Sequence, residues 1–96
     1  MEKVKFRTGR LVATRAVADR IEEDPSFYSF CALSIDRHFK GDWGELDEED
    51  KRLNDEALTI GERLLSKFVF FKTGEEIFII TERDRSVTTI LYPSDY

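Results

Sequence analysis

The sequence is poor in the residues that cross-link small proteins or bind metals. It contains one cysteine, Cys31, and one histidine, His38, among 96 residues. A single cysteine excludes an internal disulfide, and one cysteine with one histidine cannot complete a structural zinc site, so we expect no metal and no cofactor. The hydrophobic core alone must therefore stabilise the fold. A chain of this length buries about 60–65% of the surface of its unfolded state, which favours a single domain over residues 1–96.

Long apolar segments and familiar catalytic motifs are also missing. No run approaches the roughly 18 apolar residues that cross a bilayer, and the first residues lack the apolar segment of a signal peptide. We therefore predict a cytoplasmic protein without membrane contact. The sequence has no P-loop and no GxGxxG, HExxH, GxSxG or CxxC motif. The serines nearest His38 in sequence, Ser29 and Ser34, lie on the same predicted helix, which disfavours a Ser–His hydrolase.

Charge is distributed unevenly along the chain. Residues 1–20 carry six basic and two acidic side chains, a net charge of +4, whereas residues 42–56 carry eight acidic and two basic ones, a net charge of −6. Two explanations are open at this point. The segments are either surfaces for two partners or solvated regions that attract each other within the fold, and the second explanation is the more common in small proteins.

Apolar periodicity predicts an α+β fold with a short N-terminal strand, three helices and then a three-stranded antiparallel meander. Asp24 followed by Pro25 is a typical helix start, and Gly41 is a typical left-handed helix end. The third helix is predicted from the i, i+4, i+7, i+11 spacing of Leu53, Ala57, Ile60 and Leu64. The predicted elements are a strand at 11–13, helices at 14–23, 25–40 and 47–65, and strands at 67–72, 76–81 and 87–92.

The helix predicted at residues 25–40 is apolar on nearly all sides, so we expect it to lie at the centre of the fold. Cys31 on this helix should then be buried and inert, with a raised thiol pKa. The three C-terminal strands are apolar on both faces. This pattern indicates helices on one face of the sheet and a partner or the chain's own tail on the other, and a homodimer is one arrangement that it allows.

The densest polar segment is RHFKGDWG, residues 37–44. Asp42 follows His38 by four residues, a spacing at which a carboxylate can orient an imidazole and raise its pKa, so the two are candidates for a general acid and base. In the competing interpretation, His38 caps its own helix, Asp42 accepts turn amides and Trp43 fills the core between two helices. We favour this structural interpretation, because a lone histidine near a helix end stabilises the helix without any substrate.

The start of the third predicted helix is the candidate binding surface. The binding residues assigned from the sequence are Asp42, Trp43, Glu45, Asp47, Glu48 and Asp50. Trp43 is either a core residue or an exposed anchor for a partner, and we expect it to be buried, with the carboxylates left at the surface. A divalent-metal cluster of Asp42, Asp50 and Asp55 is disfavoured, because these residues lack the spacing of a calcium-binding loop.

Three segments carry a resemblance to known proteins: TGRLVATR at residues 8–15, RHFKGDWGELDEEDKRLNDEAL at 37–58 and IITERDRSVTTILYPSDY at 79–96. They resemble a family of small bacterial proteins of plasmids and integrated mobile elements, labelled "plasmid-related protein" or type I restriction enzyme subunit M. The resemblance spans nearly the whole chain, and GDWG is its most specific part. A methyltransferase does not follow from the second label, because 96 residues cannot hold a doubly wound S-adenosylmethionine domain.

These observations predict a non-enzymatic interaction or regulatory module linked to plasmids or mobile elements. We expect its acidic helix start and GDWG loop to contact a protein partner, for example a nucleic-acid-binding protein whose basic site the carboxylates complement. The alternative is a small nucleic-acid-processing enzyme that uses His38 as general acid and base.

Overall fold

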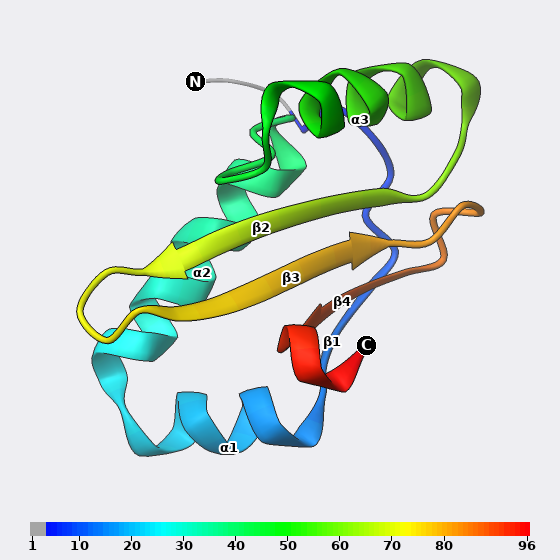
Figure 1. Cartoon of the computed structure of the whole chain (residues 1–96). Helices are drawn as coiled ribbons and strands as arrows, with labels where there is room; N and C mark the ends of the chain where they lie inside the picture. The colour runs from blue at the N-terminus through cyan, green and yellow to red at the C-terminus, as the bar shows by residue number, and fades with distance from the viewer. Residues whose placement is uncertain (1–3) are drawn as a thin grey trace.

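The computed structural model describes residues 4–96, and this part of the chain contains three α-helices and one four-stranded sheet (Figure 1). The elements are β1 (Arg10–Ala13), α1 (Arg15–Glu23), α2 (Pro25–Phe39), α3 (Glu48–Ile60), β2 (Leu64–Phe70), β3 (Glu75–Thr81), β4 (Val87–Leu91) and the 3-10 helix η1 (Pro93–Asp95). The predicted α+β class is confirmed. No helix in residues 4–96 is long and apolar enough to cross a membrane.

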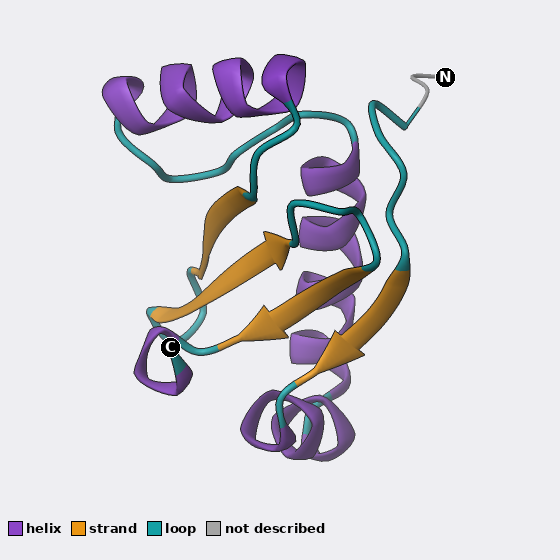
Figure 2. Cartoon of the chain, turned by 90° about the vertical axis from the view of Figure 1, so that its right-hand side faces the viewer, coloured by secondary structure: helices purple, strands orange, loops and turns teal. Residues whose placement is uncertain are grey.

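The N-terminal strand joins the same sheet as the C-terminal strands, which the sequence did not predict. The strand order is β1–β4–β3–β2, with β1 parallel to β4 and the other neighbours antiparallel (Figure 2). The predicted antiparallel meander is therefore three strands of a four-stranded mixed sheet. The parallel pairing places residues 10–13 beside residues 87–90, and no local pattern encodes a pairing between segments so far apart.

The third helix is shorter than predicted. α3 ends at Ile60, because Gly61 takes a φ of +80° and its N–H donates to the carbonyl of Ala57 at 2.9 Å. The predicted end at Leu65 was wrong, since Leu64 already begins β2. The strand replaces the helix here because its residues alternate between buried and half-buried, the period of a sheet rather than of a helix.

The apolar spacing that predicted the longer helix combined residues of two elements. Ala57 is buried in α3 and Leu64 is buried in β2, whereas Leu53 and Ile60 are exposed. The remaining boundaries also move. β2 covers residues 64–70 instead of the predicted 67–72, while β3 and β4 differ from their predictions at one end only.

The predicted starts of α1 and α2 are confirmed in part. Asp24 is the N-cap of α2, its carboxylate accepts the N–H of Ser26 at 2.9 Å, and Pro25 is the first helical residue. Thr14 stands at the N-cap of α1, but its hydroxyl donates to Asp95 at 2.8 Å instead of capping the helix. The Thr14 side chain therefore ties the start of α1 to the C-terminal tail.

Two apolar clusters form the core. The main cluster fills the space between the sheet and the helices α1 and α2, and it consists of Val17, Phe27, Cys31, Phe68, Phe70, Ile77, Ile79 and Ile90. The smaller cluster lies beneath α3 and consists of Trp43, Ala57 and Leu64. Trp43 is only 3% exposed, so the interpretation of this residue as part of the core is confirmed.

The C-terminal tail covers part of the opposite face of the sheet. The ring of Tyr96 meets the ring of Phe78 edge-on, with 6.2 Å between their centroids, and the guanidinium of Arg63 lies 5.4 Å from the centroid of the Tyr96 ring. The tail and α2 therefore lie on opposite faces of the sheet (Figure 2). Coverage by the tail is one of the two outcomes expected for the apolar outer face.

The burial of Cys31 generates a testable prediction. Its side chain is 1% exposed, and burial raises the pKa of the thiol to about 12. We predict that the native protein reacts with a thiol reagent only as fast as it unfolds, and that Cys31→Ala lowers the free energy of unfolding by about 1–2 kcal/mol through a small cavity. Labelling kinetics and urea titration measure the two effects.

The matched control for the Cys31 experiment is a thiol on the exposed side of the same helix. Ser29 is exposed, so Ser29→Cys in the Cys31→Ala background should react at once with the same reagent. Equally rapid labelling of the unmodified protein would contradict the burial of Cys31.

Candidate functional site

The GDWG loop, residues 41–44, begins at the end of α2. Gly41 takes a φ of +80°, its N–H donates to the carbonyl of His38 at 3.0 Å, and the N–H of Asp42 donates to the carbonyl of Arg37 at 2.9 Å. These two bonds form a Schellman motif, which satisfies carbonyls that the helix end leaves open. The left-handed glycine predicted at this position is confirmed, one residue after the C-cap.

Asp42 orders the loop and does not contact His38. Its carboxylate accepts the backbone N–H of Gly44 at 3.0 Å and the Nε–H of Arg37 at 2.7 Å. Partial burial opposes the charge of Asp42, but these hydrogen bonds outweigh it and hold the pKa of the carboxyl below its ordinary value. The two candidate catalytic residues, His38 and Asp42, are therefore not hydrogen-bonded to each other.

Trp43 and its neighbours join the loop to the edge of β2. The indole N–H of Trp43 donates to Asp55 at 2.9 Å. The N–H of Lys67 donates to the Trp43 carbonyl at 3.3 Å, and the N–H of Glu45 donates to the Lys67 carbonyl at 2.7 Å, which makes a one-residue parallel bridge at Gly44. Trp43 is thus held inside the fold. Its place in the predicted binding set is corrected, because a partner cannot reach a side chain that is buried.

The other predicted binding residues lie at the surface. We define the acidic surface as the exposed carboxylates Glu45, Asp47, Glu48, Glu49 and Asp50, which surround the start of α3. Asp47 is the N-cap, and its carboxylate accepts the N–H of Asp50 at 2.8 Å. Negative charge is favourable at this end of a helix because of the helix dipole. The N-cap and the helix dipole therefore explain part of the acidic surface.

Ion pairs neutralise only part of the acidic surface. Glu48 lies 3.7 Å from Lys51, and Glu49 lies 2.7 Å from Arg52, both within α3. Within residues 4–96, no lysine or arginine forms a salt bridge with the remaining three carboxylates, Glu45, Asp47 and Asp50. These three groups are exposed and carry charge that the described chain does not balance.

An apolar hollow adjoins the acidic surface. It has a volume of about 250 Å³ and is lined by Leu46, Leu53 and Leu65 together with Asp50 and Asn54. Asn54 fixes its floor, because the Asn54 side-chain amide donates to the Leu65 carbonyl and accepts the Leu65 N–H. Leu53 is 47% exposed, so apolar surface stands open to solvent directly beside carboxylates.

From residue 4 onward, the basic N-terminal segment forms no ion pair with the acidic surface. Within the described part of the chain, no salt bridge joins residues 4–20 to residues 42–56. Among the described residues, Arg15 pairs with Asp19 at 3.9 Å, and Arg20 pairs with Asp24 and Glu75. The explanation that the two charged segments attract each other therefore has no ion pair to support it.

His38 is fully buried and bonds to the sheet instead of capping its helix. Its Nδ1 lies 2.5 Å from the hydroxyl of Ser66 in β2, and its Nε2 lies 2.9 Å from the hydroxyl of Thr81 in β3. Thr81 in turn lies 2.8 Å from the hydroxyl of Thr88 in β4, which donates to the carbonyl of Thr8 at 2.7 Å. The prediction that His38 caps α2 was wrong, because its two side-chain partners lie on the strands β2 and β3.

The end of this chain of hydrogen bonds fixes the direction of every proton in it. A carbonyl can only accept, so the hydroxyl of Thr88 donates to it and must itself accept from Thr81. The Thr81 hydroxyl then accepts from Nε2–H of His38, which leaves Nδ1 to accept from Ser66. We therefore assign the Nε2–H tautomer to a neutral imidazole.

The environment of His38 does not suit acid–base catalysis. Burial lowers the pKa of His38 to about 3, and the positive charge of Arg85 contributes in the same direction. The Ser66–His38 pair has the polarity of a nucleophile and its base, but both side chains are 0% exposed. A substrate therefore has no path to the only histidine in the sequence.

A second polar cluster was not found from the sequence. Arg20 in α1 donates two hydrogen bonds to the carboxylate of Glu75 at the start of β3, and the hydroxyl of Tyr92 donates to the same carboxylate at 2.9 Å. The bonds from Arg20 lead the causes that lower the pKa of Glu75 to about 2. Residues this far apart share no sequence signal. The cluster fastens α1 to the sheet.

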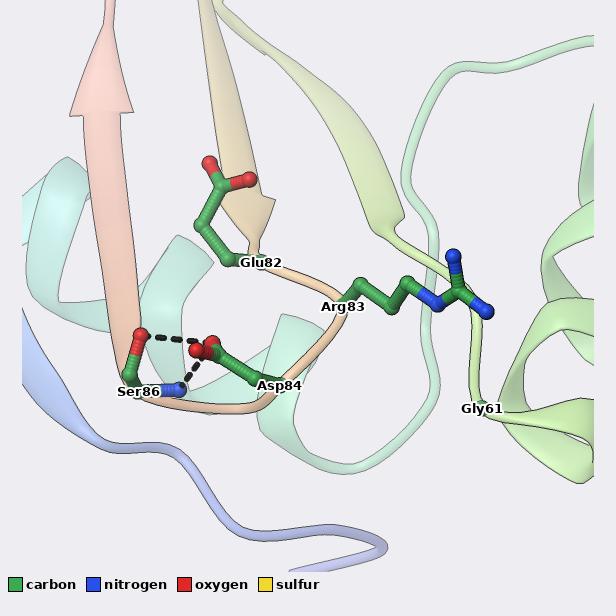
Figure 3. A pocket seen from close by; sticks show the side chains of 5 residues that line it. All are labelled: Gly61, Glu82, Arg83, Asp84 and Ser86. Carbon is green, nitrogen blue, oxygen red and sulfur yellow. Dashed lines mark hydrogen bonds between the residues drawn. The ribbon is translucent and has the colours of Figure 1, made fainter.

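Another hollow lies at the turn between β3 and β4 (Figure 3). It has a volume of about 620 Å³ and is lined by Gly61, Glu82, Arg83, Asp84 and Ser86. The carboxylate of Asp84 accepts both the N–H and the hydroxyl of Ser86, as Figure 3 shows, so this side chain stabilises the turn. The lining mixes both signs of charge and includes none of the predicted site residues.

The described residues offer no metal site. Within residues 4–96, no three His, Cys, Asp or Glu side chains converge, and every buried side-chain nitrogen or oxygen has a hydrogen-bond partner.

Comparison with known proteins gave no match to a family model, a curated protein or a solved structure. The resemblance to small plasmid proteins therefore stays a prediction.

The close approach of the GDWG loop to β2 predicts a large effect of Gly44→Ala. A Cβ at Gly44 would lie 2.0 Å from the Lys67 carbonyl oxygen and the residue also has a φ of +73°, so the bridge to β2 must break. Gly61 has a similar φ of +80° but nothing within 4 Å, which makes Gly61→Ala the matched control. We predict a loss of about 1–2 kcal/mol in unfolding free energy for Gly61→Ala, and at least about 2 kcal/mol more for Gly44→Ala. Equal losses in urea titrations would contradict the tight packing of the loop.

Burial of neutral His38 predicts a loss of stability in acid. The folded-state pKa of about 3 lies below the ordinary 6.5, so below pH 6.5 the unfolded state binds a proton that the folded state excludes. The free energy of unfolding should fall by about 1.4 kcal/mol per pH unit from this cause between pH 6.5 and about 3.

Urea titrations at pH 7, 5.5 and 4.5 measure this loss of stability. His38→Gln is the control, because it keeps the carboxylates, which also lose stability in acid, but removes the histidine proton. The stability difference between the two proteins should shrink as pH falls. A difference that is constant with pH would contradict the buried neutral imidazole.

Proposed function

We propose that this protein is a non-enzymatic interaction module that binds a basic segment of a partner protein at the acidic surface beside α3. The link to plasmids or mobile elements rests on the sequence resemblance alone. The single observation that carries the proposal is an open apolar hollow, formed by Leu46, Leu53 and Leu65, that Asp50 also lines. Two more exposed carboxylates without an ion pair among the described residues, Glu45 and Asp47, flank Leu46 in the sequence.

The charge of the acidic surface favours a basic partner. Exposed carboxylates without a cation raise the rate of association with a positively charged surface and repel other acids. Nucleic acid is repelled for the same reason. A nucleic-acid-binding protein, which presents a basic site, is a partner of the required chemistry.

The apolar hollow supports binding rather than mere solubility. A solvated acidic helix has no need of exposed leucines, whereas a binding site gains affinity from an apolar centre with a charged rim. The hollow is small, so it fits one or two apolar side chains of the partner. We therefore expect the bound segment to carry apolar residues flanked by lysine or arginine.

The enzyme alternative receives no support from the position of His38. A general acid or base must reach the proton that it transfers. His38 is enclosed by Ser66 and Thr81 and has no exposed surface.

Charge reversal tests the proposed function. We predict that Glu45→Lys with Asp50→Lys reduces the amount of partner captured from a bacterial host lysate by roughly tenfold or more, because two unbalanced charges change sign. Asp47 is left intact because it caps α3. The control, Glu22→Lys with Glu23→Lys, makes the same change in net charge on α1, where both residues are exposed, and should capture the partner normally.

Two outcomes would overturn the proposed function. One is equal capture by both double variants, which would detach binding from the acidic surface. The other is cleavage of labelled RNA or DNA by the purified protein that disappears in His38→Gln at a temperature at which circular dichroism shows the variant still folded, which would establish the enzyme alternative.

A further inference from the structure

The two edges of the sheet differ in whether another segment of the chain covers them. The edge of β2 is closed at Lys67 by the GDWG loop, through the bonds to Trp43 and Glu45. β1 is the other edge, and within residues 4–96 no strand pairs with its outer side (Figure 2). An unprotected edge presents free backbone donors and acceptors to any extended chain.

The register of β1 identifies the free groups. The N–H of Arg10 donates to the carbonyl of Ser86, directly before β4, and the N–H of Thr14 donates to the carbonyl of Ile90 in β4. Alternate residues of a parallel strand bond to the same neighbour. Leu11 and Ala13 therefore direct their N–H and C=O groups away from the sheet. Both residues are exposed.

An apolar groove runs beside this edge. It has a volume of about 460 Å³ and lies between β1 and the helices, where its lining includes Leu11, Ala13, Ile21, Tyr28, Ala32 and Ile35. Leu11 is 48% exposed and Tyr28 is 58% exposed. A strand added to β1 would direct every second side chain toward α2 and hence into this groove, since strand side chains alternate between faces. A free edge and a groove beside a helix together form the arrangement used for strand addition.

The positive charge around β1 favours an acidic segment as the added strand. Arg10 is the first residue of β1, Arg7 precedes the strand and Arg15 follows it. The Arg15 side chain is 95% exposed and forms a long ion pair with Asp19, at 3.9 Å. A second copy of this chain would bring the same arginines to the opposite side of the edge, where like charges repel. An acidic segment would be attracted.

We propose that β1 accepts, as a fifth strand, an extended segment of a partner protein in which acidic residues flank alternating apolar residues. This surface is distinct from the acidic surface in position and in sign of charge. The inference therefore does not rest on the proposed function, and the two can fail separately.

A peptide selection on the full chain tests this inference. The probe is a phage-displayed library of random nine-residue peptides. We expect enriched peptides with acidic ends and apolar residues at alternate positions, which bind the Glu45→Lys, Asp50→Lys variant as well as the unmodified protein. No enrichment, or enrichment of basic peptides, would overturn the inference.

A substitution at Ala13 tests the role of the backbone. Ala13→Pro removes an outward N–H that the sheet does not use, which edge strands tolerate. Ala13→Val is the matched control, because it adds similar volume at the same place and keeps the N–H. We expect Ala13→Pro to weaken binding of an enriched peptide at least tenfold and Ala13→Val to weaken it much less. Equal affinities would overturn the inference.

Methylation of peptide nitrogens provides a test that needs no protein variant. Methyl groups on alternate nitrogens of an enriched peptide should abolish binding, whereas methyl groups on the intervening nitrogens should be tolerated. Loss of binding without this alternation would overturn strand addition.

Sedimentation tests whether a second copy of this chain occupies the edge instead. A dimer of the unmodified protein that dissociates in Ala13→Pro would assign the edge to a second copy rather than to a partner, and would overturn the inference.

Discussion

One chain of buried hydrogen bonds determines how the rest of this structure fits together. It runs from Ser66 in β2 through His38 of α2 to Thr81 in β3, then to Thr88 in β4 and the carbonyl of Thr8 ahead of β1. A buried polar group without a partner costs about 1–3 kcal/mol, and a slip of one residue turns a strand's side chains to the other face. Apolar contacts alone tolerate many arrangements of the strands. These hydrogen bonds, in contrast, are compatible with only one register of the sheet beneath α2.

A fixed sheet leaves two edges, and the molecule closes one of them with the most distinctive part of its sequence. Gly44 lets the loop backbone approach Lys67 more closely than any side chain would permit, and Trp43 is bonded to Asp55 under α3. The GDWG loop is therefore architecture. Its distinctiveness reflects the steric demands of covering β2, and the exposed carboxylates lie beside it, on the acidic surface, rather than within it.

The parts of the fold that sequence reasoning predicted are those with local causes. Asp24 and Pro25 start α2, Gly41 follows its end, and the burial of Cys31 follows from an apolar helix. The partners of His38 lie 28 and 43 residues away, so nothing near it indicated a buried network instead of a cap. The end of α3 had a local signal in Gly61, but helical spacing that included Leu64 outweighed it. The pairing of β1 with β4 had no local sequence signal.

The arrangement of charge explains how two surfaces of opposite sign coexist without neutralising each other. β1 and β2 are separated by three strand spacings in the sheet, about 14 Å, and α3 lies on the β2 side. Attraction between exposed charges is largely screened beyond about 8 Å at physiological salt, so the basic edge and the acidic surface gain little from each other across that distance. Each surface attracts ligands that the other repels. The two proposed binding surfaces therefore lie on opposite sides of the sheet and differ in the sign of their charge, so neither proposal depends on the other.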